Sequence, residues 1–279
     1  MKPAWLIQTN MDGVDTRPMI AEVRRQGMRA IETEHSLVRK IDFLRIAGVH
    51  GDTDGSFLDL KNPHLRVVCY GDIDFVRQIQ RTVFVPGAYC NFDNMKCSTY
   101  YAYLGGHLLN KDYLMLPVGD LLRRWDGLIV SNFNRPLFIR PSSGAKPFTG
   151  YVVEPEGRDK IQTLIETVGP DTLVVVAPEK EITIEWRFVI CDGKVVTGCQ
   201  YLPIEQEGWS TPSLCLASKI AAQEWQPDRC YTVDIAESEG EVYLLEINSF
   251  GCAGFYKCDV KQIVRCASEA AVNEWKEYC

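Results

Sequence analysis

Several features that define common protein classes are absent from this chain of 279 residues. No apolar run approaches the roughly 20 residues that a membrane-spanning helix needs. There is no repeat or low-complexity tract, and the start, MKPAWLIQTNMDG, has too short an apolar segment for a signal peptide. The formal net charge of −7 argues against a general nucleic-acid-binding or anionic-membrane surface. We therefore expect an ordinary globular protein of one large or two ordinary domains, with no nucleic-acid and no membrane partner.

Cysteine and histidine metal-ligand spacings and disulfide patterns are also lacking, although the chain has eleven cysteines. Their number is odd, no CxxC pair occurs, and residues such as Cys191 and Cys199 lie in apolar, strand-like runs. We expect reduced, mostly buried thiols and a cytoplasmic location. A redox or metal role for Cys252 and Cys258 is the less favoured alternative. The four histidines show no ligand spacing, and the run HGDTDG at 50–55 is predicted to be a turn.

Strands and helices alternate along the chain, which predicts a mixed α/β (α+β) fold. Strands are predicted at 3–9, 66–70, 127–132, 136–143, 148–154 and 172–179, in a hairpin over 182–204 that turns at Asp192-Gly193, and in a second hairpin over 231–251. Helices are predicted at 18–26, after the turn Gly71–Asp74, over 94–110 and 159–168, from Lys219 to Trp225, and over 260–278. Asp72 is predicted to cap the helix that follows its turn.

The second hairpin, YTVDIAESEGEVYLLEINSFG, carries the most informative polar residues. Side chains alternate faces along a strand, so Glu246 and Asn248 share one face, and Asp234 on the paired strand could join them. Two carboxylates and an amide oxygen form a hard-oxygen site suited to Mg²⁺. An acidic residue at a strand end is by itself more often a solvated turn residue, but Asp234 lies in a β-rich run where an unpartnered charge is costly. The hairpin therefore predicts a magnesium site made by Asp234, Glu246 and Asn248.

Read in order, these segments resemble the ATP-grasp superfamily over roughly residues 94 to 256. The strand–loop element PLFIRPSSGAKPFTG is similar to the family's "vvKPxxGxxxxG" pattern, with Arg140 where the family normally has a phosphate-binding lysine. This departure resembles a divergent clade with arginine at that position. Arginine stays charged and offers a planar fork of donors that matches phosphate oxygens.

The resemblance implies further roles for named residues. Adenine would bind backbone groups at Val176 and Ala177, and Glu185 would contact the sugar of the nucleotide. The alternative for the pair Glu185 and Arg187 is a surface ion pair worth about 0–1 kcal/mol. The implied nucleotide-binding residues are Lys96, Arg140, Ser142, Ser143, Lys146, Val176, Ala177, Glu185 and Arg187, of which Arg140, Lys146 and Arg187 would neutralise the transferring charge.

The resemblance implies an ATP-grasp fold with a small N-terminal α/β domain at 1–93 and an ATP-grasp domain at 94–279, divided into subdomains at about 94–178 and 179–279. It implies an ATP- and Mg²⁺-dependent ligase, with two ions expected, that joins a small-molecule or peptide carboxylate to an amine through an acyl phosphate. The alternatives are an ATP-dependent phosphotransferase and a degenerate ATP-binding regulatory module. We expect the tyrosine-rich segment 100–103 and the Gly71–Asp74 turn to shape the acceptor pocket, and exposed tyrosines of that segment to favour a homodimer.

Overall fold

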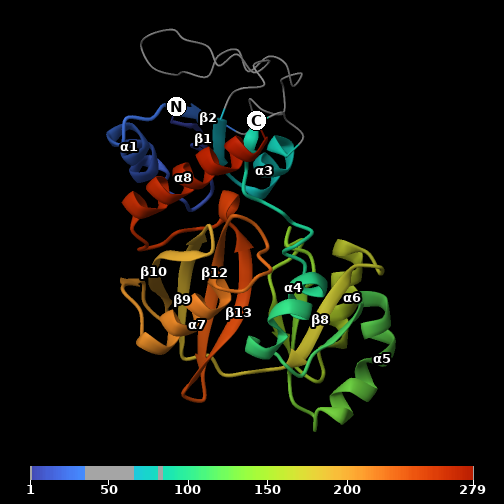
Figure 1. The fold of residues 1–279 in the computed structure, drawn as a ribbon. Helices are drawn as coiled ribbons and strands as arrows, with labels where there is room; N and C mark the ends of the chain where they lie inside the picture. Colours follow the sequence, from blue (N-terminus) through green and yellow to red (C-terminus); the bar gives the residue numbers. More distant parts are fainter. Residues whose placement is uncertain (1, 35–65, 81–83, 279) are drawn as a thin grey trace.

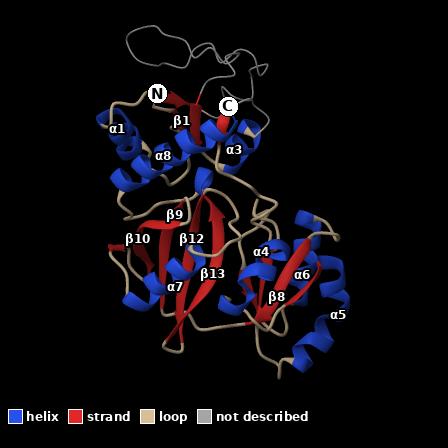
Figure 2. Cartoon of the chain, in the orientation of Figure 1, coloured by secondary structure: helices blue, strands red, loops and turns tan. Residues whose placement is uncertain are grey.

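The chain forms three β-sheets with helices packed on them in the computed structural model, which describes residues 2–34, 66–80 and 84–278. The first sheet lies together with α1, α3 and α8 at one end of the molecule (Figure 1). The two other sheets lie side by side at the opposite end, one around β9, β12 and β13 and the other around β8 (Figures 1 and 2). The predicted mixed α/β class is confirmed. The turn predicted at 50–55 lies outside the described residues.

The first sheet is parallel, with strand order β2-β1-β3-β4. Its strands are β1 (Ala4–Gln8), β2 (Ala30–Thr33), β3 (Arg66–Tyr70) and β4 (Val85–Gly87), and its helices are α1 (Arg17–Arg25), α3 (Ile73–Ile79) and α8 (Val260–Tyr278). The β1 run is buried after its first residue, as a parallel strand covered on both faces requires. Asp72 caps α3 as predicted, because its carboxylate accepts a hydrogen bond of 2.8 Å from the Phe75 amide.

The second sheet is antiparallel, with strand order β5-β8-β6-β7. Its strands are β5 (Leu114–Pro117), β6 (Leu137–Pro141), β7 (Tyr151–Val153) and β8 (Leu173–Pro178), and the helices near it are α4 (Cys97–Leu104), η1 (Gly105–His107), α5 (Val118–Ser131) and α6 (Arg158–Val168). Apolar side chains from α5 and α6 share one core with those of β6 and β8. This core anchors the loop that follows β6.

The third sheet is antiparallel, with strand order β11-β10-β9-β12-β13. Its elements are β9 (Ile184–Cys191), β10 (Lys194–Leu202), β11 (Gln206–Glu207), α7 (Thr211–Ala221), β12 (Cys230–Ser238), β13 (Glu241–Ser249) and η2 (Phe250–Cys252). The hairpin predicted to turn at Asp192-Gly193 is confirmed. Both turn residues have positive φ (46° and 71°), which is the backbone that an Asp-Gly turn favours.

Two predicted elements are wrong. Residues 127–132 were expected to be a strand but form the end of α5, where Leu121, Trp125 and Ile129 recur every fourth residue and are buried. A helix was expected from Lys219, but α7 begins at Thr211, because Ser210 caps it by accepting a hydrogen bond of 3.2 Å from the Ser213 amide. In both segments the flanking residues, and not the apolar run itself, determine where the helix lies.

The C-terminal helix α8 returns to the first sheet and packs against α1 and β3 (Figure 1). The division into domains at 1–93 and 94–279 stays a prediction. None of the helices within the described ranges combines the length and the apolar character that a membrane crossing requires.

Candidate functional site

The predicted carboxylates meet on one face of the third sheet because β12 lies between β9 and β13. The register sets Asp234 of β12 opposite Arg187 of β9 on one side and opposite Glu246 of β13 on the other. Asn248 lies two residues beyond Glu246, on the same face of the strand. The structure therefore brings together Asp234, Glu246 and Asn248 as the sequence predicted, and it adds Arg187 to the group.

Arg187 and Asp234 form a buried, two-pronged ion pair. Arg187 donates from Nε and Nη2 to the two Asp234 carboxylate oxygens, both at 2.7 Å, and from Nη1 to the Gly254 carbonyl at 2.8 Å. The side chains are only 8% and 1% exposed, so the pair is shielded from water. Burial raises the pKa of Asp234, and the Arg187 guanidinium acts in the opposite direction. The alternative of a surface ion pair between Glu185 and Arg187 is therefore wrong, because Arg187 pairs with Asp234 in a buried position.

Glu246 links the third sheet to the second. Its carboxylate accepts hydrogen bonds from Arg140 Nη2 at 2.7 Å and from Lys146 Nζ at 2.8 Å, both of which come from β6 or the loop after it. Burial by itself raises the pKa of Glu246, but the Lys146 and Arg140 charges outweigh it and hold that pKa well below its usual value. Glu246 is therefore ionised at neutral pH, with two cations facing it.

Asn248 lies between the two carboxylates. Its Nδ2 donates to Asp234 Oδ2 at 3.1 Å and to Glu246 Oε1 at 3.0 Å, so the three side chains converge on one point. The described part of the chain holds no group of three or more His, Cys, Asp and Glu side chains that could share a metal, and Asn248 faces the two carboxylates with its Nδ2, so the magnesium site stays a prediction. Carboxylate and amide oxygens fit Mg²⁺, which prefers hard oxygen ligands.

The loop after β6 holds Lys146 close to Glu246. Lys146 has a left-handed backbone (φ 45°), and its amide donates to the Ser143 carbonyl at 3.1 Å. Gly144 packs against Met95, and a Cβ at this glycine would lie 2.8 Å from the Met95 Cβ. Ser143 Oγ accepts from the Ala145 amide at 3.2 Å, which tightens the same turn. The loop is therefore a closed turn that points its lysine at the carboxylate.

Ser142 and Lys96 have structural partners in the same region. Ser142 is buried, and its carbonyl and hydroxyl oxygens accept from the amides of Cys97 (2.8 Å) and Ser98 (3.2 Å) at the start of α4. Lys96 lies next to this contact, but its Nζ pairs with Asp93 at 2.7 Å. The structure therefore brings Lys96 near the loop after β6 but not into the Glu246 cluster.

Val176 and Ala177 lie on β8, between β5 and β6. Val176 is registered with Leu114 of β5 and with Ile139 of β6, so its backbone belongs to ladders on both sides. Ala177 is registered with Phe138 of β6, and among the described residues the β5 ladder ends before it. The β5 side of β8 is therefore unpaired from Ala177 toward the linker to β9, within the described residues.

Glu185 has a partner that the sequence did not indicate. The Tyr201 hydroxyl donates to the Glu185 carboxylate, and burial raises the pKa of Glu185. The Tyr201 ring stacks on Tyr256 at 4.8 Å, and the Arg187 guanidinium carbon lies 5.5 Å and 5.0 Å from the centres of these two rings. Tyr201 lies at a register shift of β10 between Gln200 and Leu202, and this irregularity, which the sequence does not indicate, places its side chain beside Glu185 and Arg187.

The tyrosine-rich segment does not form an exposed surface. Tyr100 and Tyr101 are buried in the core below the third sheet. Tyr103 is 55% exposed and stacks on Trp225 at 4.3 Å. Of the three tyrosines considered for an interface, Tyr103 alone is exposed, and the homodimer stays a prediction.

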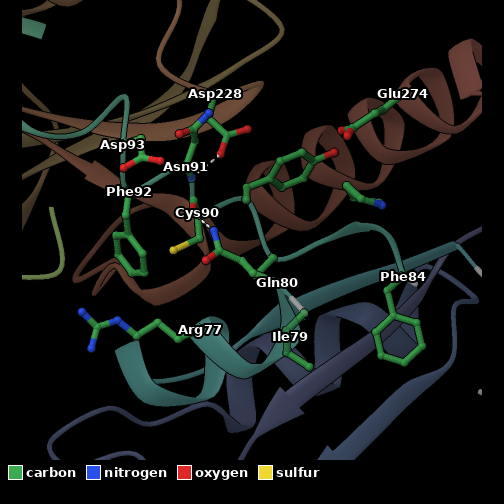
Figure 3. A pocket seen from close by; sticks show the side chains of 13 residues that line it. Arg77, Ile79, Gln80, Phe84, Cys90, Asn91, Phe92, Asp93, Asp228 and Glu274 are labelled. Carbon is green, nitrogen blue, oxygen red and sulfur yellow. Dashed lines mark hydrogen bonds between the residues drawn. The ribbon is translucent and has the colours of Figure 1, made fainter. Parts of the chain in front are cut away.

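A cavity of about 650 Å³ lies apart from this cluster, at the end of the first sheet. Figure 3 shows Asp228 beside Asn91 on one side of it, and Arg77 beside Phe92 on the other. Asp228 accepts from the amides of Asn91 (3.1 Å) and Arg229 (2.8 Å), and burial raises its pKa to about 7. This cavity was not predicted from the sequence.

Comparison with known proteins gives a family and a fold. Residues 123–266 match the family of the ATP-grasp domain, R2K clade family 2. Comparison with curated proteins finds no match.

Among solved structures, D-cycloserine synthetase DcsG is similar with a TM-score of 0.66 and 13% identity, over 96% of this chain and 99% of that one. The macrocyclase MdnC of Microcystis aeruginosa, bound to its precursor peptide MdnA, has a TM-score of 0.61 and 13% identity over 97% and 99%. The D-alanine–D-alanine ligase of Bacillus anthracis has a TM-score of 0.58 and 15% identity over 99% and 100%. At these identities the likeness shows the fold, which is the ATP-grasp fold that the sequence predicted.

Proposed function

Because the chain belongs to the ATP-grasp domain family of the R2K clade, family 2, we propose that it is an ATP- and Mg²⁺-dependent ligase that joins a carboxylate to an amine. The observation that carries the proposal is the meeting of three cations with two carboxylates and an amide where the second and third sheets adjoin. A site that binds a metal–nucleotide complex needs cationic side chains for the phosphate oxygens and oxygen ligands for the metal.

The charge pattern supports a division of roles. Arg140 and Lys146 come from the second sheet and would take phosphate oxygens in place of Glu246. Glu246, Asp234 and Asn248 would then hold Mg²⁺, which when bound neutralises phosphate charge. Asp234 can do this while paired with Arg187, since an ionised carboxylate has about four acceptor positions and Arg187 uses two.

The proposed reaction has two steps. A carboxylate oxygen of one substrate forms a bond to the γ-phosphorus of ATP, the bond to the β–γ bridging oxygen breaks, and ADP leaves. The amine nitrogen of the second substrate then bonds to the acyl carbon, phosphate leaves with the carbon–oxygen electron pair, and the nitrogen loses a proton. The enzyme would contribute mainly positioning and charge neutralisation.

Residues around the cluster would contact the nucleotide and the acyl group. The open edge of β8 from Ala177 would bind adenine, and Glu185 would contact the sugar after Tyr201 releases or shares its carboxylate.

Arg187 keeps two unassigned N–H donors after its bonds to Asp234 and Gly254, and these would face the acyl phosphate. Ser142 and Ser143 would bind phosphate through the loop's backbone, and Lys96 would reach it by leaving Asp93.

The class of substrate is supported by the neighbours. Their names describe ligation of an amino acid (D-alanine–D-alanine ligase), cyclisation of a precursor peptide (MdnC) and synthesis of D-cycloserine. A small molecule or a peptide that carries the carboxylate or the amine is therefore the proposed substrate.

ADP release is the experiment that tests the proposal. The chain is incubated with ATP, Mg²⁺ and a panel of amino acids and short peptides, alone and in pairs. We expect ADP release that needs both a carboxylate and an amine, and a loss of about 10²-fold or more in Glu246→Gln. Glu241→Gln on the exposed start of the same strand is the matched control and should keep full turnover. Release with a single hydroxyl-bearing acceptor would indicate phosphoryl transfer instead, and no release with any pair would contradict the proposal.

A further inference from the structure

Two thiols from distant parts of the chain touch behind Arg187. Cys199 lies in β10, and Cys258 lies in the segment between η2 and α8. The Cys258 thiol donates to Cys199 Sγ with the two sulfurs 3.3 Å apart, and both residues are buried (0% and 5% exposed). A disulfide has a sulfur–sulfur length of about 2.05 Å, so an approach of about 1.3 Å would join them.

We propose that Cys199 and Cys258 form an oxidation site that a small hydroperoxide converts to a disulfide. The Cys199 thiolate attacks one peroxide oxygen, the O–O bond breaks, and Cys199 becomes a sulfenic acid while hydroxide leaves. The Cys258 sulfur then attacks the sulfenic sulfur, the S–O bond breaks, and water leaves. In total, two thiols and one hydrogen peroxide give one disulfide and two waters, with the sulfurs oxidised and the peroxide reduced.

The surroundings favour Cys199 as the sulfur that reacts first. The hydrogen bond from Cys258 and the nearby Arg187 charge both lower the pKa of Cys199, against the effect of burial. The hydrogen bond raises the pKa of Cys258, which remains a thiol that can resolve the intermediate. A sulfur whose pKa is lowered and which lies within contact distance of a thiol is the arrangement in which oxidation proceeds to a disulfide rather than to higher acids.

The bond would move the segment that completes the Arg187 site. Gly254 in this segment accepts from Arg187 Nη1 at 2.8 Å, and Tyr256, which stacks on Tyr201, has a left-handed backbone with φ 47°. Drawing Cys258 toward β10 therefore pulls the Gly254 carbonyl and the Tyr256 ring relative to the guanidinium. The effect on turnover rests on the proposed function, whereas formation of the disulfide does not.

The other cysteines supply internal controls. Cys215 lies in α7 and is exposed, so it reports how much oxidant reaches the surface. Cys191 and Cys230 are buried and face each other across β9 and β12. Their oxidation therefore measures how reactive a buried pair of cysteines is when it does not lie beside Arg187. The alternative to the proposal is that Cys199 and Cys258 are packed thiols without special reactivity, as most buried cysteines are.

Peptide mapping of the native chain tests the proposal without any nucleotide. The protein is treated with hydrogen peroxide, its remaining thiols are alkylated, and its peptides are analysed by mass spectrometry without reduction. We expect a linked pair of peptides containing Cys199 and Cys258, removed by dithiothreitol, at peroxide concentrations that leave Cys191 and Cys230 alkylated as free thiols. In Cys258→Ser the linked pair should be lost and a sulfenic acid on Cys199 should be trapped by dimedone.

Two results would overturn the proposal. One is that Cys215 is oxidised while Cys199 and Cys258 are still recovered as alkylated thiols. The other is that the linked pair forms only after the chain is unfolded in urea. Both are read from the unsubstituted chain, so a folding defect in Cys258→Ser does not affect the decision. If the disulfide forms and dithiothreitol restores lost ADP release, the disulfide acts on the proposed site. If the disulfide forms in a chain that releases no ADP even when reduced, the oxidation site stands and the proposed function fails.

Discussion

Asp234→Asn tests the view that the Arg187–Asp234 pair is a buried charge pair that organises the site. The substitution keeps the shape of the side chain but removes its charge and replaces one acceptor with an NH₂ donor, which then faces an arginine donor at the former 2.7 Å contact. Arg187 is left 8% exposed with a full charge and no carboxylate. Removing one partner of such a pair costs about 3–5 kcal/mol in the free energy of unfolding.

The assay is urea unfolding followed by circular dichroism, with Asp126→Asn as the matched control. Asp126 pairs with Arg158 at 3.2 Å on the surface, where the two side chains are 84% and 46% exposed. An exposed pair contributes about 0–1 kcal/mol, so this variant should unfold almost like the parent. A second test replaces both buried partners, as Asp234→Leu with Arg187→Met.

The double variant should regain most of the lost stability, because an apolar pair carries no desolvation cost. The reasoning would be refuted if Asp234→Asn costs less than about 1 kcal/mol, the range of the exposed pair. It would also be refuted if the double variant were no more stable than the single one.

Three further predictions concern stability. Cations hold the pKa of Glu246 below its usual value, so this carboxylate stabilises the fold above the unfolded-state pKa and ceases to do so as the pH falls. In Glu246→Gln, the free energy of urea unfolding should therefore depend less steeply on pH from about pH 5 down to 2. An unchanged slope would contradict the assignment. Burial raises the pKa of Asp228 to about 7, so its contribution is present at low pH and is lost as the pH rises toward 7. Asp228→Asn should remove that loss over about pH 4 to 8, and a parallel pH curve for parent and variant would show that the carboxyl is not perturbed. A Cβ at Gly198 would lie 2.5 Å from Phe188 Cδ1, so Gly198→Ala should cost about 1–3 kcal/mol in urea unfolding. Gly127 lies in open space on a helix, so Gly127→Ala should raise the free energy of unfolding by about 0.5–1 kcal/mol. Equal effects of Gly198→Ala and Gly127→Ala would contradict the packing argument.

Local patterns predicted most of the strands and helices because each signal lies within the segment itself. The Asp192-Gly193 turn depends on two residues that tolerate a positive φ, and the Asp72 cap depends on one carboxylate that accepts from a helix amide. The apolar run at 127–132 could not be assigned in this way, since its three apolar side chains fit both a strand and a buried turn of helix. Only the spacing back to Leu121 and Trp125 identifies α5.

The meeting of the candidate site's side chains was predictable from the sequence only in part. Glu246 and Asn248 share a face because of their spacing along one strand, a property of sequence alone. The pairing of Asp234 with Arg187 depends on β12 lying beside β9, strands that are not consecutive in the chain. The contact of Arg140 with Glu246 joins two different sheets and depends on how these pack.

Calorimetry of ATP binding with and without Mg²⁺ tests the central claim most directly. The parent chain is compared with the double variant Glu246→Ala, Asn248→Ala and with the control Glu241→Ala, whose side chain is exposed on the same strand. The account predicts Mg²⁺-dependent ATP binding by the parent and the control, and loss of the Mg²⁺ dependence in the double variant. No ATP binding by the parent, or equal Mg²⁺-dependent binding by the double variant, would contradict it.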